Sequence, residues 1–365
     1  MMKSQEELFS IVGRFAVKGH VRSVEPLGNG LINDTFKVCM DGDEQYVLQR
    51  INHLIFTDVD LLQHNIEVVT AHLRRKLESA GEADIDRKVL RFIPLSDSPK
   101  TYLKDGDAYW RISVFIPDAY TYETVDPEFS YYAGKAFGRF EADLADLDEP
   151  LGETIPDFHN MELRDRQLKE AIAADPVGRM SDPEVREIAE YLAAYSHQMC
   201  KAERMYREGT LPKRICHCDT KVNNMMFDAD GNVLCVIDLD TVMPSFVFSD
   251  FGDFLRTAAN TAPEDEPDTD KIAFRMDIFK AFAKGYIESA SVFLTPVERE
   301  NLPYASCLFP YMQAVRFFAD YINGDIYYKI KYPEHNLVRT RAQIKLFKVA
   351  LSKTGEMKSY LDSLD

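Results

Sequence analysis

The sequence predicts an α+β protein in two lobes, a small β-rich N-terminal lobe over residues 1–116 and a larger, mostly helical C-terminal lobe over residues 117–365. The first lobe contains several strand-like runs that are separated by turn residues. Beyond it, apolar residues recur at the three- and four-residue spacing of helices that bury one face. With 365 residues, of which 45% are hydrophobic, the chain is long enough to bury a core in each lobe.

The N-terminal lobe is expected to begin with a short amphipathic helix over residues 5–17, followed by strands over 21–27, 31–40 and 45–51. Gly28, Asn29 and Gly30 fill the turn between the first two strands. Glycines there permit a tight turn and a close approach of the backbone to a phosphate group. The turn is therefore interpreted as a loop that covers a nucleotide, or alternatively as an ordinary hairpin turn.

The rest of this lobe reads as a helix over roughly 59–77 and two further strands over 88–94 and 110–116. The helix carries Glu67, which could pair with Arg50 of the preceding strand or face solvent. Ile116-Pro117-Asp118-Ala119 then breaks the strand pattern. We place the connection between the lobes at this break.

The C-terminal lobe is expected to open with a helix from Asp126-Pro127 to about residue 147, because an Asx cap followed by proline is typical of helix starts. Residues 148–180 are rich in Asp and Pro and read as an insertion. Ser181-Asp182-Pro183-Glu184 has the pattern of a capping box and predicts a long helix that ends near Gly209. Further helices follow residue 253.

Between these helices, residues 215–253 gather a histidine, several carboxylates and two asparagines around two short apolar runs. The runs 225–227 and 233–237 flank a turn-rich segment and predict a β-hairpin. Asp219 and Asn224 come just before its first strand, and Asp238 ends its second. We expect these three side chains to converge at one end of the hairpin.

Phosphoryl transfer from ATP requires a base for the attacking hydroxyl and oxygen ligands for Mg²⁺. Protein kinases place the catalytic Asp five positions before a metal-binding Asn, with a second metal-binding Asp after a hairpin. The sequence has the same spacing, which predicts Asp219 as the catalytic base and Asn224 and Asp238 as Mg²⁺ ligands. The alternative is an ordinary acidic loop, since Asp and Asn also suit turns for their own hydrogen bonds.

Two neighbouring features are expected to have structural roles. Asp250-Phe251-Gly252 spells the DFG tripeptide of kinases, but it lies well beyond the hairpin. Asp250 and Asp253 are therefore expected to brace the catalytic loop by accepting backbone hydrogen bonds. His217 is interpreted as a buried histidine that orients the same loop.

At these positions the chain resembles the aminoglycoside phosphotransferase family, which carries an H-G-D-x-x-x-x-N loop and a later I-D; here the matching residues are HCDTKVNN (217–224) and Ile237-Asp238. Within the family it looks most like the N-acetylhexosamine 1-kinases. That narrower resemblance rests on GNGLINDTF, HCDTKVNN, VIDLDTVMP, DFGD, RFFADYINGDIYY and KYPEHNLVRTRAQIKL. It implies a two-lobed protein-kinase-like fold and ATP-dependent phosphorylation of N-acetylglucosamine or N-acetylgalactosamine at the anomeric C1 hydroxyl.

The resemblance also implies residues of the sugar pocket. In the 1-kinases the region matching RFFADY and GDIYY lines this pocket, which implies substrate contacts for Arg316, Asp320 and Tyr327, beside Asp219. One departure concerns the third strand, where kinases carry a phosphate-binding lysine. This chain has Gln49 and Arg50 there, and the strand register decides which of them contacts the nucleotide. The alternatives are a kinase for an amino alcohol or aminoglycoside, and a catalytically silent nucleotide-binding module.

Composition narrows the remaining partners. A net charge of −17 disfavours a nucleic-acid partner, because phosphates are bound by clustered Lys and Arg. No stretch has the apolar length of a membrane span, and we expect a cytoplasmic monomer or weak homodimer. The six cysteines form no C-x-x-C pair, so reduced thiols are expected and a zinc site at Cys216-His217-Cys218 is disfavoured.

Overall fold

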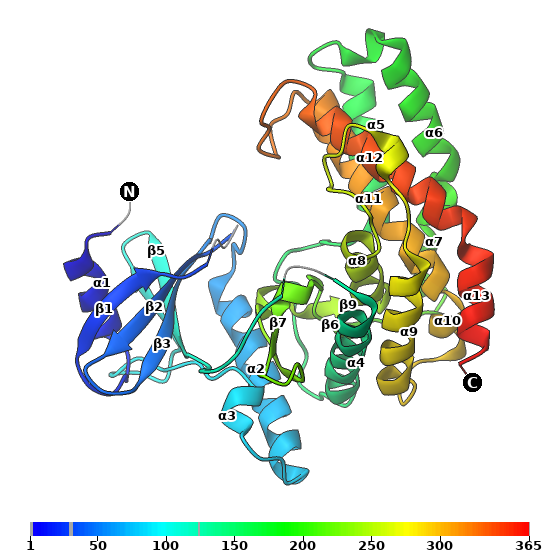
Figure 1. Cartoon of the computed structure of the whole chain (residues 1–365). Helices are drawn as coiled ribbons and strands as arrows, with labels where there is room; N and C mark the ends of the chain where they lie inside the picture. The colour runs from blue at the N-terminus through cyan, green and yellow to red at the C-terminus, as the bar shows by residue number, and fades with distance from the viewer. Residues whose placement is uncertain (1–2, 29–31, 123–124, 365) are drawn as a thin grey trace. The chain divides into compact units, whose positions relative to one another are not determined.

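The computed structural model describes residues 3–28, 32–122 and 125–364 (Figure 1). The chain divides into two compact units, and each unit is described by itself. The N-terminal unit comprises Met1–Thr121, Asp146–Pro156 and Met225–Met243. The C-terminal unit comprises Tyr122–Ala145, Asp157–Asn224 and Pro244–Asp365. The lobe boundary that the sequence analysis places at residue 116 stays a prediction. Each compact unit consists of three separate stretches of chain.

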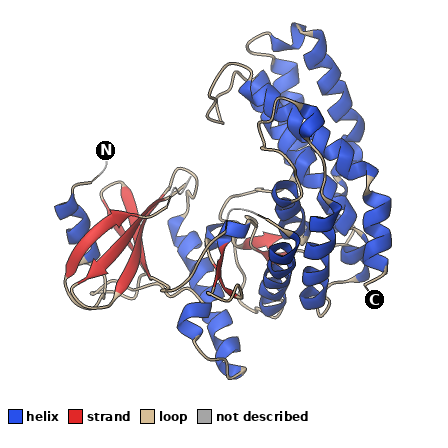
Figure 2. Ribbon diagram, in the orientation of Figure 1, coloured by secondary structure: helices blue, strands red, loops and turns tan. Residues whose placement is uncertain are grey.

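The N-terminal unit is built on an antiparallel sheet with the strand order β1-β2-β3-β5-β4 (Figure 2). Its strands are β1 (Val21–Pro26), β2 (Asp34–Met40), β3 (Gln45–Ile51), β4 (Tyr102–Asp105) and β5 (Ala108–Val114). Helix α1 (Gln5–Val12) packs on one face through Leu8, Ile11 and Val12, which join a core with Trp110 and other strand residues. Two more helices follow β3, α2 (Val59–Ser79) and α3 (Ile85–Lys88).

The strand predicted over residues 88–94 is wrong. The segment starts in α3 and touches the sheet through one bridge, Phe92 to Ser113, flanked by hydrogen bonds from Ile93 N to the Ile112 carbonyl and from Val114 N to the Arg91 carbonyl. On this edge β4 pairs with β5 only as far as Arg111, and the segment meets the remaining residues of β5 through this single bridge. The apolar character of the segment therefore reflects burial and not strand pairing. Helix α1 also ends earlier than expected, at Val12.

The predicted hairpin is confirmed and belongs to the N-terminal unit. Strand β7 (Met225–Phe227) pairs antiparallel with β8 (Val233–Val236), and a short 3-10 helix, η3 (Leu239–Thr241), follows. Phe227 also exchanges backbone hydrogen bonds with Tyr120. In this way the segment after β5 and the hairpin are joined within one unit.

The C-terminal unit is mostly helical (Figure 2). Its α-helices are α4 (Pro127–Leu144), α5 (Met161–Ala174), α6 (Pro183–Met199), α7 (Lys201–Arg207), α8 (Phe248–Ala258), α9 (Met276–Ala290), α10 (Pro296–Glu300), α11 (Leu302–Ile322), α12 (His335–Ser352) and α13 (Thr354–Asp362). Its short elements include β6 (Arg214–Cys216) and the 3-10 helices η1 (Arg179–Ser181), η2 (Val222–Asn224) and η4 (Thr269–Lys271). Strand β9 (Met243–Ser245) begins at Met243, the last residue of the N-terminal unit, and continues into the C-terminal unit.

Two details of the predicted helices change. The helix expected from residue 181 to about 209 is broken at Cys200 into α6 and α7. Its N-cap is Asp182, whose side chain accepts from Glu184 N at 2.8 Å, so the capping box predicted on Ser181 is wrong. Proline at the first helical position fixes the residue before it as the cap.

Helices α4 and α9 cross with their backbones in contact. A Cβ added at Gly285 would lie 2.0 Å from the Tyr131 carbonyl oxygen, and one at Gly134 would lie 2.1 Å from the Phe282 carbonyl oxygen. Both distances are far below van der Waals contact. Glycine at these positions therefore sets the separation of the two helices.

Gly285→Ala is expected to lower the free energy of unfolding by about 1–3 kcal/mol, because the methyl group forces α4 and α9 apart. Gly355→Ala is the matched control, since Gly355 lies in α13 with open space around it. Alanine there should raise the stability by up to about 1 kcal/mol through its higher helix propensity. Urea unfolding of both variants measures the difference, and equal effects would contradict the packing.

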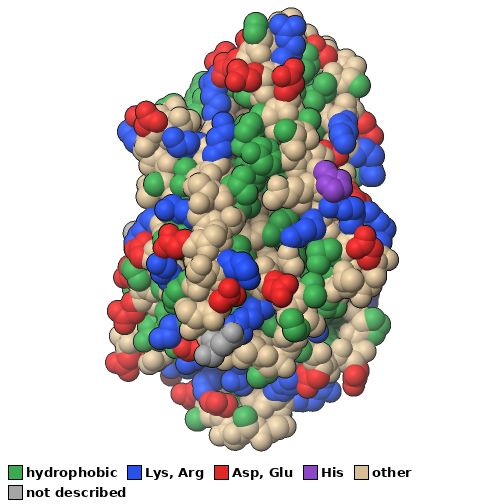
Figure 3. All heavy atoms as spheres, turned by 90° about the vertical axis from the view of Figure 1, so that its right-hand side faces the viewer, with side chains coloured by type: hydrophobic (Ala, Val, Ile, Leu, Met, Phe, Trp, Pro, Cys, Tyr) green, Lys and Arg blue, Asp and Glu red, His purple; other side chains and the backbone are tan. Residues whose placement is uncertain are grey.

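No helix within the described ranges is long and apolar enough to cross a membrane. In the view of Figure 3, Lys and Arg side chains alternate with Asp and Glu side chains, and hydrophobic side chains lie between them. A nucleic-acid-binding face would instead carry a continuous basic stripe. The charges on the face shown in Figure 3 are therefore mixed.

Candidate active site

The predicted catalytic loop runs from the end of β6 through η2 in the C-terminal unit. Asn224 Nδ2 donates to the Asp219 carbonyl oxygen at 2.8 Å and to Asp219 Oδ2 at 3.3 Å. Lys221 Nζ lies 2.6 Å from Asp219 Oδ1, and the Asp219 side chain keeps 20% of its surface exposed. The structure thus brings Asp219 and Asn224 together, with one face of the carboxylate open to solvent.

Asp250 holds this loop from behind. Its Oδ2 accepts from His217 N and its Oδ1 from Cys218 N, both at 2.7 Å. Thr220 Oγ1 donates to the Asp250 carbonyl oxygen at 2.8 Å. These hydrogen bonds hold the backbone of Cys218 in a left-handed conformation with φ 63°, which residues other than glycine rarely adopt.

The bracing role predicted for Asp250 is therefore confirmed, and the DFG tripeptide lies inside helix α8. The same prediction for Asp253 is wrong, because Asp253 Oδ1 accepts from Arg256 Nε at 2.9 Å. His217 is fully buried and its ring is steeply inclined to the neighbouring rings of Phe137 and Phe140. Its Nδ1 accepts from Asp219 N at 3.3 Å, which matches the orienting role expected of it.

The predicted metal ligands offer oxygen, the donor that Mg²⁺ prefers. The Asn224 amide uses its nitrogen for Asp219, and no hydrogen bond to its Oδ1 occurs within the described residues. Asp238 belongs to the N-terminal unit, where it follows β8, is exposed and has a left-handed backbone, φ 59°. Backbone strain of this kind is concentrated at functional sites. Each residue by itself suits a magnesium ligand.

On the N-terminal sheet, the side chains of Gln49 and Arg50 point to opposite faces because they are neighbours in β3. Gln49 Oε1 accepts from Arg111 Nε at 2.9 Å, whereas Arg50 lies 3.5 Å from Asp34 and remains exposed. Glu67 accepts a hydrogen bond from Thr101 and does not pair with Arg50. Gly28 lies two residues beyond the end of β1 and has φ 69°, and Asn29 and Gly30 lie outside the described residues.

Arg111 is a buried cation that the sequence analysis did not single out. Its guanidinium contacts Asp240 Oδ1 at 2.6 Å, and both side chains are at most 3% exposed. Asn33 Nδ2 donates to the other Asp240 oxygen at 2.7 Å. Asp240 follows Asp238 by two residues, so this buried ion pair fixes the segment that carries the predicted metal ligand. An arginine inside the apolar strand AYWRISV was the available signal.

The residues expected in the sugar pocket have different surroundings. The Tyr327 side chain is 72% exposed, and Arg316 lies over the Tyr328 ring at 5.7 Å. Asp320 is 5% exposed and accepts from the backbone N–H groups of residues 326–328 and from Asn336 Nδ2. Asp320 thus shapes the loop that carries Tyr327, and its oxygens are already occupied.

Two more residues, His159 and Arg164, lie within electrostatic range of Arg316 and were missed in the sequence. His159 lies within electrostatic range of Asp219, Arg316 and Arg164, and burial together with these guanidiniums lowers the pKa of His159 to about 3. Its ring is therefore neutral at pH 7. Arg164 donates to backbone carbonyls of residues 157 and 158, and burial and Arg316 lower the pKa of Arg164. The insertion had given no periodic signal for either residue.

Residues 23–286 match the model of the family described as "Phosphotransferase enzyme family". Among solved structures, the chain is similar to an aminoglycoside phosphotransferase from Alicyclobacillus acidocaldarius (TM-score 0.61, 10% identity, covering 97% of this chain and 96% of that one). It is also similar to an amicoumacin kinase in complex with AMP-PNP and Ca²⁺ (TM-score 0.61, 11% identity, covering 95% of this chain and 94% of that one). A third similar structure is a choline kinase from Cryptosporidium parvum (TM-score 0.57, 14% identity, covering 98% of this chain and 99% of that one). These likenesses confirm the predicted kinase-like fold.

Proposed function

Because this chain belongs to the phosphotransferase enzyme family, whose model its residues 23–286 match, we propose that it phosphorylates N-acetylglucosamine or N-acetylgalactosamine at the anomeric C1 hydroxyl. ATP is the phosphoryl donor, and the products are the sugar 1-phosphate and ADP. The family supports the transfer of a phosphoryl group. The sugar is supported by the resemblance of the late stretches RFFADYINGDIYY and KYPEHNLVRTRAQIKL to the N-acetylhexosamine 1-kinases.

In the proposed reaction, Asp219 accepts the proton of the C1 hydroxyl as this oxygen attacks the γ-phosphorus. Asn224 holds the loop closed through its amide nitrogen, and Lys221 orients one oxygen of the Asp219 carboxylate. Asn224 Oδ1 and the Asp238 carboxylate would hold Mg²⁺. When bound, this ion supplies positive charge against the phosphates.

For the nucleotide we propose the loop of Gly28, Asn29 and Gly30 together with Gln49. Gln49 is favoured over Arg50 because it contacts Arg111, whose partner Asp240 lies in the segment of Asp238. Arg50 is on the other face of β3 beside Asp34. Gln49, hydrogen-bonded to the guanidinium of Arg111, would thus take the place of the lysine that other kinases carry on this strand.

The observation that carries the choice of acceptor is the charge around His159. Within the described residues, neither Arg164 nor Arg316 forms an ion pair with a carboxylate; Arg316 Nη1 donates to Gln313 Oε1 at 3.2 Å. A cationic amino alcohol placed there would meet these two guanidiniums, and like charges repel. A neutral sugar with an acetamido carbonyl and several hydroxyls can accept their hydrogen bonds. Tyr327 adds an exposed ring for stacking.

The experiment that tests this function is ADP release with ATP, Mg²⁺ and a panel of acceptors. N-acetylglucosamine and N-acetylgalactosamine should give the highest kcat/KM, and choline, homoserine and kanamycin should give little or none. A site built to hydrogen-bond a group discriminates strongly against compounds without it. Faster turnover with any amine than with both sugars would replace the proposal with an amino-alcohol or aminoglycoside kinase.

Arg316→Ala is expected to raise the KM for the sugar by about tenfold to a hundredfold, because a hydrogen bond from a charged donor contributes about 1.5–3 kcal/mol. The KM for ATP should stay nearly unchanged. The control is Arg341→Ala, because the Arg341 guanidinium pairs with Glu184 on another helix at 2.7 Å and should affect only stability. An unchanged sugar KM in Arg316→Ala would remove Arg316 from the pocket.

A further inference from the structure

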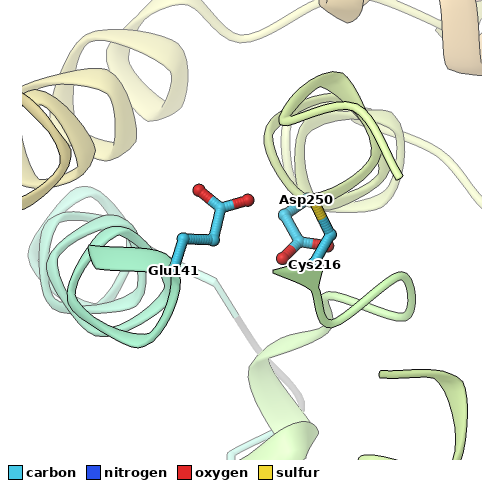
Figure 4. A group of neighbouring side chains, drawn as sticks. All are labelled: Glu141, Cys216 and Asp250. Carbon is cyan, nitrogen blue, oxygen red and sulfur yellow. The ribbon is translucent and has the colours of Figure 1, made fainter. Parts of the chain in front are cut away.

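Three buried groups from different elements meet behind the catalytic loop. Glu141 of α4 extends toward Asp250 of α8 and Cys216 of β6 (Figure 4). One carboxylate oxygen of each acid and the Cys216 sulfur all lie within 4.8 Å of one another, and all three residues are buried. Tyr286 of α9 donates its hydroxyl to Glu141 Oε2. None of these groups belongs to the proposed chemical step.

The hydrogen bonds of this cluster leave one place for a proton. Both Asp250 oxygens accept backbone N–H groups of the loop, at 2.7 Å each. Glu141 Oε1, in contrast, is buried and accepts no hydrogen bond within the described residues, and the Cys216 thiol beside Glu141 is only a weak donor. An ionised Glu141 would face another carboxylate in a fully buried site, which is costly. A protonated Glu141 becomes a donor, and Asp250 can accept from it.

The surrounding charges do not supply another solution. The nearby arginine on β6, Arg214, is already bound to Glu298 at 2.9 and 3.0 Å. Burial raises the pKa of Asp250 as well, but His217 and the two backbone N–H donors of the loop act in the opposite direction. Burial keeps the Cys216 thiol protonated by raising its pKa well above the usual range. Burial and the Asp250 charge likewise raise the pKa of Glu141 well above the usual range. Asp250 has two N–H donors that favour its ionised form, so the proton resides on Glu141.

We propose that Glu141 is a positioning residue of the catalytic loop: its protonated carboxyl group donates to Asp250 and holds that side chain where it binds the backbone of residues 217 and 218. Glu141 acts only through Asp250. The loop geometry at Asp219 then depends on a proton buried between α4 and α8. A carboxyl, a thiol and a carboxylate are also zinc ligands, but both Asp250 oxygens are already engaged by the loop.

Folding should take up this proton, and unfolding should release it. In the unfolded chain a glutamate titrates near pH 4.3, whereas the raised pKa keeps Glu141 protonated in the folded protein. The stability of the wild-type protein therefore falls as the pH rises above the unfolded value. Glu141→Gln carries no such proton and can still donate to Asp250 and accept from Tyr286. Above about pH 5.5, and over the range in which the folded protein keeps this proton, the unfolding constant of the wild type should rise about tenfold per pH unit relative to Glu141→Gln. This measurement needs no substrate, so it does not depend on the proposed acceptor. A ratio that stays flat with pH would overturn the shared proton.

The positioning role is tested by kcat. Glu141→Gln should keep a kcat close to that of the wild type, because its amide replaces the donor. Glu141→Leu should lower kcat by up to about a hundredfold with little change in the KM for ATP, since a small displacement of a catalytic group has that effect. The control is Glu203→Gln, which removes a buried glutamate that caps Met161 N and does not touch the loop. Equal kcat values for the Gln and Leu variants would contradict the proposal. So would a bound metal in the purified wild type that Glu141→Gln lacks. If Glu141→Leu does not fold, the unfolding constants of Glu141→Gln decide alone.

Discussion

Asp219→Asn is expected to lower kcat by about a hundredfold to ten-thousandfold while leaving the fold intact, because an amide is nearly isosteric but cannot accept the hydroxyl proton. The contacts that hold the loop do not depend on this side chain. Asn224 still donates to the backbone carbonyl of residue 219, and Asp250 still binds the loop from behind. Steady-state ADP release and urea unfolding measure the two properties separately.

The control for this substitution is Asp230→Asn, which changes an exposed aspartate in the turn of the β7–β8 hairpin. It should leave kcat unchanged. If Asp219→Asn turned over at close to the wild-type rate, Asp219 would not be the base.

The second large effect is expected for Asp238→Asn, which should abolish magnesium-dependent turnover. The carboxylate supplies both an oxygen ligand and a negative charge to a hard cation, and an amide keeps only the oxygen. Raising the Mg²⁺ concentration should restore part of the rate. Titration of kcat against Mg²⁺ measures this shift.

Asp250→Asn provides the contrast, because it lies in the tripeptide that marks the metal ligand in other kinases. An amide at this fully buried site leaves one loop N–H without an acceptor, which costs about 1–3 kcal/mol of stability. The Mg²⁺ requirement of the folded variant should stay close to that of the wild type. A larger Mg²⁺ requirement in a fully folded Asp250→Asn than in Asp238→Asn would show that the assignment of the ligand is reversed.

Local patterns carried much of the fold. The hairpin after Asn224, the helix opened by Asp126-Pro127 and the bracing role of Asp250 all follow from short-range features: turn residues, a cap and the distance of a motif from the hairpin. The strand predicted over residues 88–94 failed for a non-local reason, since the segment begins in α3 and meets β5 at a single bridge beyond the residues that pair with β4. No local sequence pattern shows which segments pair as strands.

The site shows the same division. The spacing of Asp219 and Asn224 in the sequence was enough to predict that they meet. In contrast, the ion pair of Arg111 with Asp240 and the meeting of Glu141 with Asp250 join residues more than a hundred positions apart. In the sequence, the only sign of these two contacts was a single charged residue within an otherwise apolar helix or strand. The side-chain direction of Gln49 and Arg50 likewise required the register of β3.

The most direct measurement of the central claim is the position of the phosphate in the product. The chain is incubated with ATP, Mg²⁺ and N-acetylglucosamine, and the product is examined by ³¹P and ¹H NMR. The account predicts a phosphate coupled to the anomeric proton, as in a sugar 1-phosphate, and no such product with Asp219→Asn. Phosphate coupled to the C6 protons, or no sugar phosphate under conditions where an amino alcohol is phosphorylated, would contradict it.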